Sequence, residues 1–228
     1  MPKKSLYSGN GMDEKHCPLC SGIQIAPYHR DKTRSYYRCG TCELIFVPER
    51  YHLSAATEKK RYDLHTNHPD DPGYRRFLHR LFEPLNAVIA PGSHGLDFGS
   101  GPGPTLSVMF EEAGHRMDIY DPFYADNPEV FDRTYDFITA TEVVEHLRAP
   151  GKELPRLFDR LKPGGYMGIM TRQVKDQDAF ATWRYIDDDT HIAFFSRPAF
   201  EWLAAQLPAQ LRFIEKDIVL LRRQPLSG

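Results

Sequence analysis

The chain has 228 residues, of which 41% are hydrophobic and 26% are charged, and its formal net charge is −2 at pH 7. These values suit a soluble protein with one α/β domain and a small appendage, and an excess of only four positive charges in residues 1–68 is far too small to predict a nucleic-acid-binding surface. No apolar run approaches the ~20 residues that cross a bilayer, and no apolar core follows residues 1–5, so we expect a cytoplasmic protein without a membrane span or signal peptide.

All four cysteines lie near the start of the chain, in two Cys-x-x-Cys pairs with 18 residues between the pairs. Two such turns can direct four thiolates at one ion and complete a tetrahedral shell that leaves no position for a substrate. Two disulfides are the main alternative, but they are uncommon in a chain without an export signal, and a redox pair or an iron centre are others. The spacing predicts a structural zinc site, with the ligands Cys17, Cys20, Cys39 and Cys42.

The segments around these pairs have the aromatic and β-branched character of short strands, at residues 23–29, 35–38 and 44–48. A module of this size has too little apolar mass to fold alone, so a bound metal would supply its stability. We therefore expect residues 1–52 to form a small zinc ribbon.

Residues 53–90 predict helices that are interrupted by a turn at residues 67–73, which contains two prolines and a glycine. After the turn, apolar side chains recur at helical spacing and are expected to face a core. These side chains are Phe77, Leu78, Leu81, Phe82 and Leu85. The segment is expected to act as a bridge between the ribbon and the rest of the chain.

Residues 91–228 predict a doubly wound α/β domain that begins with a strand at residues 95–98 and a glycine-rich turn at residues 99–103. Glycines let the backbone approach a ligand, the next helix presents its N-terminus, and Asp121 at the tip of the following strand can hydrogen-bond both hydroxyls of a ribose. Asp97 would repel a pyrophosphate but could hold the charged methionine end of S-adenosylmethionine. The turn therefore favours S-adenosylmethionine over a dinucleotide.

Only 14 residues separate Asp121 from Asp136, which is short for a helix, a strand and their loops. We expect the third strand of the sheet and its preceding helix to be abbreviated or absent. Phe123 or Tyr124 could then stack on an adenine.

The second half of the domain predicts a strand at residues 137–140, a helix at 154–161, a strand at 166–171, a helix at 197–207 and further strands within 211–221. A long polar loop, residues 172–190, lies between the strand at 166–171 and the helix at 197–207 and could close over a substrate. His191 follows this loop directly.

Four motifs in order carry a resemblance to a known family: the glycine turn, residues 117–121, residues 135–146 with their Glu-His end, and residues 161–170 with a Lys-Pro-Gly-Gly turn. The chain resembles the class I S-adenosylmethionine-dependent methyltransferases, in particular a small bacterial group, over roughly residues 62–222. The resemblance implies a Rossmann-like sheet with an antiparallel end and a methyl donor above the first two strand tips.

The resemblance also implies site residues. Donor contacts are expected from Asp97, Gly99, Ser100, Gly101, Gly103, Asp121, Pro122, Phe123, Thr141 and Glu142. A lid before the first strand is expected to include Tyr62, His65 and Asn67, although helix capping is an equally good account of them. Trp183 and Tyr185 are expected to line the acceptor pocket or only to solvate the loop.

Methyl transfer is an in-line displacement, so the enzyme aligns acceptor, methyl group and sulfur and removes a proton where the acceptor requires it. His191 is our first candidate for the base and His146 the second, because histidine titrates near neutrality. Glu145 is expected to orient either imidazole. Packing at the strand tip for His146, and anchoring of the following helix for His191, are the alternatives.

Two features that the sequence lacks restrict the chemical class of the methyl acceptor. If the ribbon uses all four cysteines, none is left as a nucleophile for pyrimidine C5 methylation, and the sequence lacks the Asn/Asp-Pro-Pro-aromatic motif used on exocyclic base amines. We expect a small-molecule acceptor. An RNA methyltransferase that docks RNA on the ribbon is the alternative, because aromatic and basic residues lie between the cysteine pairs, and a catalytically silent zinc-containing adaptor is a third reading. No feature predicts an oligomeric state.

Overall fold

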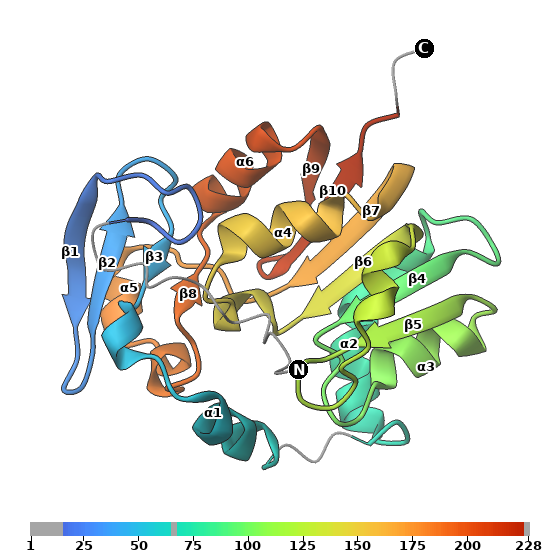
Figure 1. The fold of residues 1–228 in the computed structure, drawn as a ribbon, viewed down its shortest axis with the longest axis horizontal. Coiled ribbons are helices and arrows are strands. Elements are labelled where there is room, and N and C mark those ends of the chain that lie inside the picture. Colours follow the sequence, from blue (N-terminus) through green and yellow to red (C-terminus); the bar gives the residue numbers. More distant parts are fainter. Residues whose placement is uncertain (1–15, 65–67, 226–228) are drawn as a thin grey trace, which may run out of the picture.

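The computed structural model describes residues 16–64 and 68–225, which form two β-sheets with helices packed around the larger one (Figure 1). The larger sheet has six strands in the order β5-β4-β6-β7-β10-β9. These strands are β4 (His94–Phe98), β5 (Arg116–Tyr120), β6 (Tyr135–Thr141), β7 (Leu161–Met170), β9 (Ala209–Phe213) and β10 (Ile218–Arg223). The first four in that order are parallel, and β10 runs antiparallel to both of its neighbours. The predicted doubly wound sheet with an antiparallel end is therefore confirmed.

The shortened connection after β5 explains why this strand forms an edge of the described sheet. Residues 121–134 contain only an isolated bridge between Asp121 and Ala125 and the 3-10 helix η2 (Pro128–Asp132). The expectation that the third strand and its helix are abbreviated or absent is confirmed.

Two apolar layers hold helices on opposite faces of this sheet. On one face, α2 (Pro72–Asn86) and α3 (Thr105–Glu112) cover alternate residues of β6 and β10, among them Phe137 and Leu220. On the other face, α4 (Pro150–Phe158) and α6 (Arg197–Gln206) cover the residues between them. This division follows from the period of two in a strand, which sends successive side chains to opposite faces.

One predicted boundary is wrong. The helix expected at residues 154–161 begins at Pro150 and ends at Phe158, and β7 already begins at Leu161. The Lys-Pro-Gly-Gly segment lies inside β7, where its pairing with β6 shifts register. Gly164 has a φ of 82°, a backbone conformation that glycine adopts without steric cost, so the chain can bend there and remain in the strand.

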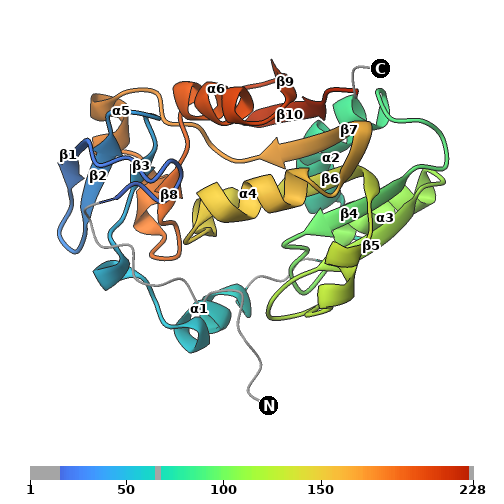
Figure 2. The same cartoon turned by 45° about the horizontal axis from the view of Figure 1, so that its top comes forward.

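The smaller sheet contains the predicted ribbon strands and one strand from the far end of the chain. Its order is β1-β2-β3-β8, and all three pairings are antiparallel. The strands are β1 (Ile25–Arg30), β2 (Ser35–Cys39), β3 (Ile45–Phe46) and β8 (Ala193–Phe194). Figures 1 and 2 both place this sheet beside one end of the larger one. The boundary of the zinc ribbon at residue 52 remains a prediction. The strand β8, which completes the ribbon sheet, comes from outside that boundary.

A close backbone contact also joins the first cysteine turn to the body. The amide of Gly151, at the start of α4, donates to the carbonyl of Pro18 at 3.1 Å. A Cβ atom on Gly151 would lie 2.0 Å from the carbonyl oxygen of Leu19. Only glycine permits this approach, so the turn and α4 are fitted to each other.

The long loop after β7 differs from the prediction of a polar segment that closes over a substrate. It contains the short helix α5 (Gln177–Ala181) and the 3-10 helix η4 (Arg184–Asp187), and its apolar side chains are buried against β2 and β8. Phe180, for example, lies edge-on to the rings of Tyr36 and Phe194. Burial of these aromatic rings fixes the loop in place.

The segment expected to form the bridge contains α1 (Ala55–Tyr62) and α2. The side chain of Ser54 caps α1 by accepting a hydrogen bond from the amide of Thr57, and that of Asp71 caps α2 by accepting from the amides of Gly73 and Tyr74. No helix in residues 16–64 and 68–225 combines the length and apolar character that a bilayer crossing requires.

Candidate functional site

The glycine turn after β4 is held tightly against the ends of its neighbouring strands. Gly99 and Gly101 have positive φ angles of 76° and 65°. A Cβ atom on Gly99 would lie 2.4 Å from the side chain of Val143, so a larger residue does not fit there. The amides of Gly99 and Ser100 donate to the carbonyl of Tyr120 at 2.7 and 3.2 Å.

A cavity of about 470 Å³ opens beside this turn, at the carboxyl ends of β4, β5 and β6. Crevices at this edge of an open α/β sheet are the usual ligand sites of such folds. Most of the expected donor residues line it, namely Gly99, Ser100, Gly101, Asp121, Pro122, Phe123, Thr141 and Glu142. At the other end it is lined by His146, Asp188 and His191.

Asp121 lies at the end of β5 with its carboxylate fixed by backbone amides. One oxygen accepts from the amide of Gly101 at 3.0 Å, and the other accepts from the amides of Phe123 and Tyr124 at 2.8 and 3.1 Å. The side chain is buried. Three of the four lone-pair directions of this carboxylate are thereby occupied, and one direction on Oδ2 remains for a hydrogen bond from a ligand.

Asp97 lies behind the turn, and among the described residues it is not part of the cavity wall. Its two oxygens accept from the hydroxyls of Thr139 at 2.6 Å and Ser107 at 3.2 Å. Burial raises the pKa of Asp97 to about 6, although the two hydroxyls oppose this shift. Gly103 is also outside the wall. Thr139 and Ser107 were not predicted, since isolated small polar residues in a strand and a helix carry no sequence signal.

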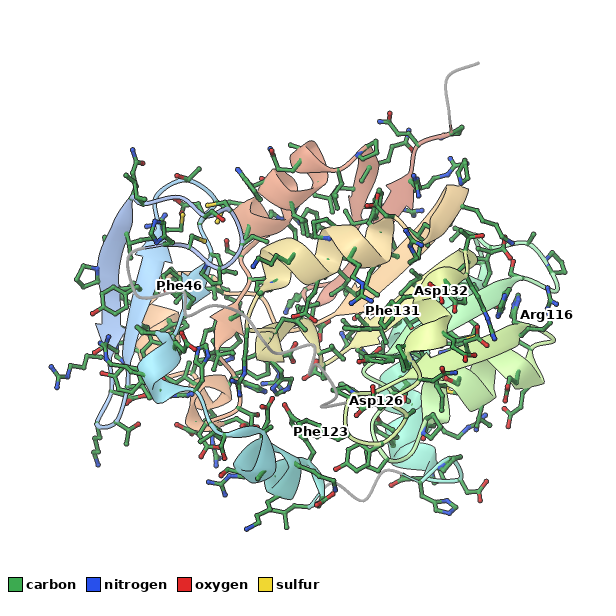
Figure 3. The ribbon with its side chains drawn as sticks, viewed as in Figure 1. Phe46, Arg116, Phe123, Asp126, Phe131 and Asp132 are labelled. Carbon is green, nitrogen blue, oxygen red and sulfur yellow. The ribbon has the colours of Figure 1, made fainter. Side chains whose placement is uncertain are left out.

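Phe123 projects from the loop after β5 toward α1, as Figure 3 shows. Its ring centre lies 5.8 Å from that of Tyr62, and Tyr62 in turn meets His146 edge-on at 5.4 Å. These three rings connect the donor end of the cavity with the histidines. Tyr62 thus lies where the lid was expected, whereas His65 and Asn67 fall outside the described residues.

Glu142 has an unusual backbone conformation at the tip of β6. Its φ is 52°, which is uncommon for a residue with a side chain and is frequent at functional sites. Burial and the nearby Glu145 raise the pKa of Glu142 to about 8, while Arg172 opposes the shift. Its surroundings therefore favour the protonated carboxyl.

The histidines at the other end form a cluster with Glu145, and the ring centres of His146 and His191 are 4.7 Å apart. Nδ1 of His146 lies 3.1 Å from the carbonyl oxygen of Thr190, and Nδ1 of His191 lies 2.7 Å from that of Tyr185. A carbonyl only accepts hydrogen bonds, so each Nδ1 carries a proton, and in the neutral form of either ring the lone pair is on Nε2.

Glu145 is fully buried beside these rings, on the 3-10 helix η3 (Val144–His146). Its Oε1 accepts a hydrogen bond from the Tyr185 hydroxyl, and its Oε2 has no hydrogen-bond partner among the described residues. One ligand atom from each of Glu145, His146 and His191 lies within 4.8 Å of the others. Two imidazole nitrogens and a carboxylate oxygen could hold a divalent cation of the Mn²⁺ to Zn²⁺ series.

The surroundings of His191 favour the neutral form of its ring. Burial and the neighbouring His146 lower its pKa, although Glu145 and Asp188 oppose the shift. The ring is therefore neutral at pH 7, with its Nε2 lone pair available.

The remaining predicted residues are not brought to this cavity. Tyr185 lies behind Glu145, and Trp183 lines a different cavity of about 960 Å³ between the ribbon and the end of β7. Phe77, which the helical spacing assigned to the core, lines the site cavity near the start of α2, together with Tyr74. Helical periodicity identifies the apolar face of a helix, but it does not distinguish a face packed on a core from one that borders a cavity.

The four cysteines form a second cluster, and all of them are free thiols. The Sγ atoms of Cys17 and Cys42 are 3.4 Å apart, as are those of Cys20 and Cys39. The amides of Leu19, Gly22 and Thr41 point at three of the sulfurs from 3.3 to 3.4 Å. Four converging thiols with amide donors around them fit one tetrahedral metal ion.

Comparison with known proteins assigns this fold to a family. A family model described as a methyltransferase domain matches residues 67–208, which is more than half of the chain. The ubiquinone biosynthesis O-methyltransferase of Vibrio atlanticus (strain LGP32) is 29% identical over 77 residues, which is 34% of this chain and 32% of that one. The chain therefore matches about a third of the length of this curated relative.

Two solved structures from Burkholderia thailandensis are similar in fold. An O-methyltransferase family protein is 15% identical with a TM-score of 0.47, over 75% of this chain and 64% of that one. A 1,6-didemethyltoxoflavin-N1-methyltransferase with bound 1,6-didemethyltoxoflavin and S-adenosylhomocysteine is 16% identical with the same TM-score, over 87% of this chain and 99% of that one. Similarities at this level carry no argument about an acceptor.

Proposed function

The chain belongs to the methyltransferase-domain family, and from this premise we propose that it transfers a methyl group from S-adenosylmethionine to a small molecule held beside His146 and His191. The observation that carries the proposal is the single cavity that joins the glycine turn and Asp121 to the two histidines. A donor at one end and an acceptor at the other would place the methyl group between them.

The donor end supports binding of a nucleoside. The fixed carboxylate of Asp121 would accept a hydrogen bond from a ribose hydroxyl at the remaining direction of Oδ2, and Phe123 would cover the adenine. Asp97 would support the strand end behind the turn, where it accepts from Thr139 and Ser107, rather than touch the methionine end.

The acceptor end supports removal of a proton. His191 would accept it at Nε2, because its Nδ1 is already bonded to the Tyr185 carbonyl. Glu145 and Asp188 would stabilise the resulting imidazolium, whereas His146 opposes it. A hydroxyl is the acceptor group that needs this help most, since its own pKa is far above neutrality.

The same cluster gives a second account of how the acceptor is activated. A divalent cation on Glu145, His146 and His191 would lower the pKa of a hydroxyl bound to it. The unpartnered Oε2 of Glu145 favours this account, because a buried carboxylate oxygen without a donor is costly.

Several contacts favour a small acceptor over RNA. A cavity of about 470 Å³ falls within the range of small-molecule sites. Of the basic residues between the cysteine pairs, Arg34 is buried and Arg38 pairs with Glu43. These two arginines are therefore used within the protein and do not form a phosphate-binding surface.

We also propose that Cys17, Cys20, Cys39 and Cys42 hold one structural zinc ion. The four thiols converge, and no ligand position would remain for a substrate, so the ion would stabilise the ribbon without taking part in chemistry.

The test is methyl transfer from S-adenosylmethionine with an isotopically labelled methyl group to a fractionated metabolite extract, followed by mass spectrometry. A labelled small product would support the proposal, and a protein that neither binds S-adenosylmethionine nor labels any fraction would overturn it. Repeating the reaction after chelation, with zinc in the ribbon verified by metal analysis, separates the two accounts of activation. Undiminished turnover after chelation would support proton removal by His191 without a metal. Turnover that is lost on chelation and restored by Mn²⁺ or Mg²⁺ would support activation of the acceptor by a bound cation.

A further inference from the structure

The ribbon hairpin reaches into the body at Arg34, which lies between β1 and β2. Arg34 is only 6% exposed, which is rare for an arginine. Its Nη1 donates to the carbonyls of Asp189 at 3.2 Å and His191 at 3.0 Å, and its Nη2 donates to those of Ile186 at 2.6 Å and Asp188 at 3.0 Å. One guanidinium therefore binds four carbonyls within residues 186–191.

Two other carbonyls of the same segment orient the histidines. The carbonyl of Tyr185 accepts from His191, and that of Thr190 accepts from His146. The backbone of residues 185–191 thus directs some carbonyls at Arg34 and the others at the imidazoles. A shift of this segment would move both sets, because the planar peptide units that carry the carbonyls of Tyr185 and Thr190 adjoin units whose carbonyls bind Arg34.

The hairpin that carries Arg34 is itself fixed. Oδ1 of Asp31 accepts from the amides of Thr33 and Arg34, both at 2.6 Å, and Oδ2 accepts from the Tyr36 hydroxyl at 2.6 Å. At its other end β2 terminates in Cys39, one of the four clustered thiols. The hairpin is therefore a rigid connection from the cysteine cluster to the histidines.

We propose that Arg34 is a positioning residue for the acceptor end of the cavity, which rests on the methyl-transfer function proposed above. It holds residues 186–191 so that His146 and His191 remain in the Nδ1–H form, with their Nε2 lone pairs available. The donor end is untouched by this contact, because it is built on the tips of β4 and β5. Loss of Arg34 should therefore lower turnover without weakening the binding of S-adenosylmethionine.

The test compares Arg34→Met and Arg34→Lys with the wild type, each in its zinc-loaded form. The matched control is Arg30→Met, which removes an exposed arginine from the same hairpin. The first measurement needs no acceptor: two-bond ¹H–¹⁵N correlation spectra report which ring nitrogen of each histidine carries the proton. We expect the Nδ1–H form for both rings in the wild type and the control, and its loss for His191 in Arg34→Met.

The second measurement separates kcat from donor affinity. We expect kcat to fall ~10²-fold in Arg34→Met, the size of effect that an ångström-scale misplacement produces. Arg34→Lys should be intermediate, since an ammonium group cannot reach four carbonyls in the fork geometry of a guanidinium. The dissociation constant for S-adenosylmethionine should stay within about twofold.

Unchanged histidine tautomers together with wild-type kcat in Arg34→Met would overturn the proposal. If that variant does not fold, the same two readouts on Arg34→Lys decide the matter, with unchanged values again counting against it. A wild-type protein that fails to bind S-adenosylmethionine would instead count against the proposed function, because the tautomer measurement does not depend on the donor.

Discussion

The donor end of the cavity is built from the backbone of one short turn, whereas the acceptor end is built from side chains that distant segments bring together. At the donor end, Gly99 and Gly101 shape the wall and a single side chain, Asp121, adds the polar group. At the acceptor end, the rings of His146 and His191 depend on carbonyls of a loop that Arg34 holds from 152 to 157 positions away in the chain. The donor end should therefore tolerate changes in the ribbon that disable the acceptor end.

The strongest test of this difference is to remove the metal from the ribbon. Cys39→Ser should abolish binding of one zinc equivalent, and structural zinc sites of this type contribute on the order of 10 kcal/mol to folding of their module. Metal analysis and thermal unfolding measure the loss. We expect turnover to disappear even though no cysteine lines the cavity. A metal-free native protein with two disulfides would contradict the zinc site.

The substitution His191→Asn tests the acceptor end directly. If His191 is the base, kcat should fall ~10²- to 10⁴-fold, while calorimetry should find donor binding nearly intact. Asparagine keeps a donor for the Tyr185 carbonyl, so the loop should stay in place. Normal turnover in this variant would transfer the role to His146 or remove the need for a base.

The matching break at the donor end is Asp121→Ala. Loss of hydrogen bonds from a charged group should weaken binding of S-adenosylmethionine by about 1.5 to 3 kcal/mol. At saturating donor, kcat should change much less than in His191→Asn. Unchanged donor affinity by calorimetry would remove Asp121 from the donor site.

The smallest expected effect is a change with pH in the free energy of unfolding, caused by Asp97 behind the glycine turn. Its pKa is raised on folding, from an ordinary value of 3.8 to about 6, so the folded state holds its proton more tightly than the unfolded state. The resulting stability is fully present below about pH 4 and is lost as the pH rises through 6. Between pH 5 and pH 7 the wild type should lose on the order of 1.4 kcal/mol relative to Asp97→Asn.

Urea unfolding of both proteins at the two pH values measures this difference. Any contribution of the cysteine cluster to the pH dependence cancels, because both proteins carry the cluster. A constant offset between wild type and Asp97→Asn would show that the carboxyl is already ionised at pH 5.

The same difference explains what the sequence could predict. Donor residues such as Gly99 and Asp121 belong to compact motifs whose geometry follows from neighbouring residues, and the absent third strand follows from a residue count. The role of Arg34 depends on contacts across more than 150 positions, and nothing near it in the sequence indicates a buried side chain. The polar composition of residues 172–190 does not indicate the packing of this loop for a related reason, because burial of Phe180 requires the ribbon sheet beside it.

The shared sheet has a consequence for the order in which the chain assembles. During synthesis the residues up to Phe46 emerge long before Ala193 and Phe194. Until β8 has been synthesised, one edge of β3 therefore lacks its partner strand. That edge is only two residues long, which offers little to a wrong partner. A ribbon that captures its metal early would present a finished template, and the last third of the chain would complete it by adding the strand that precedes α6.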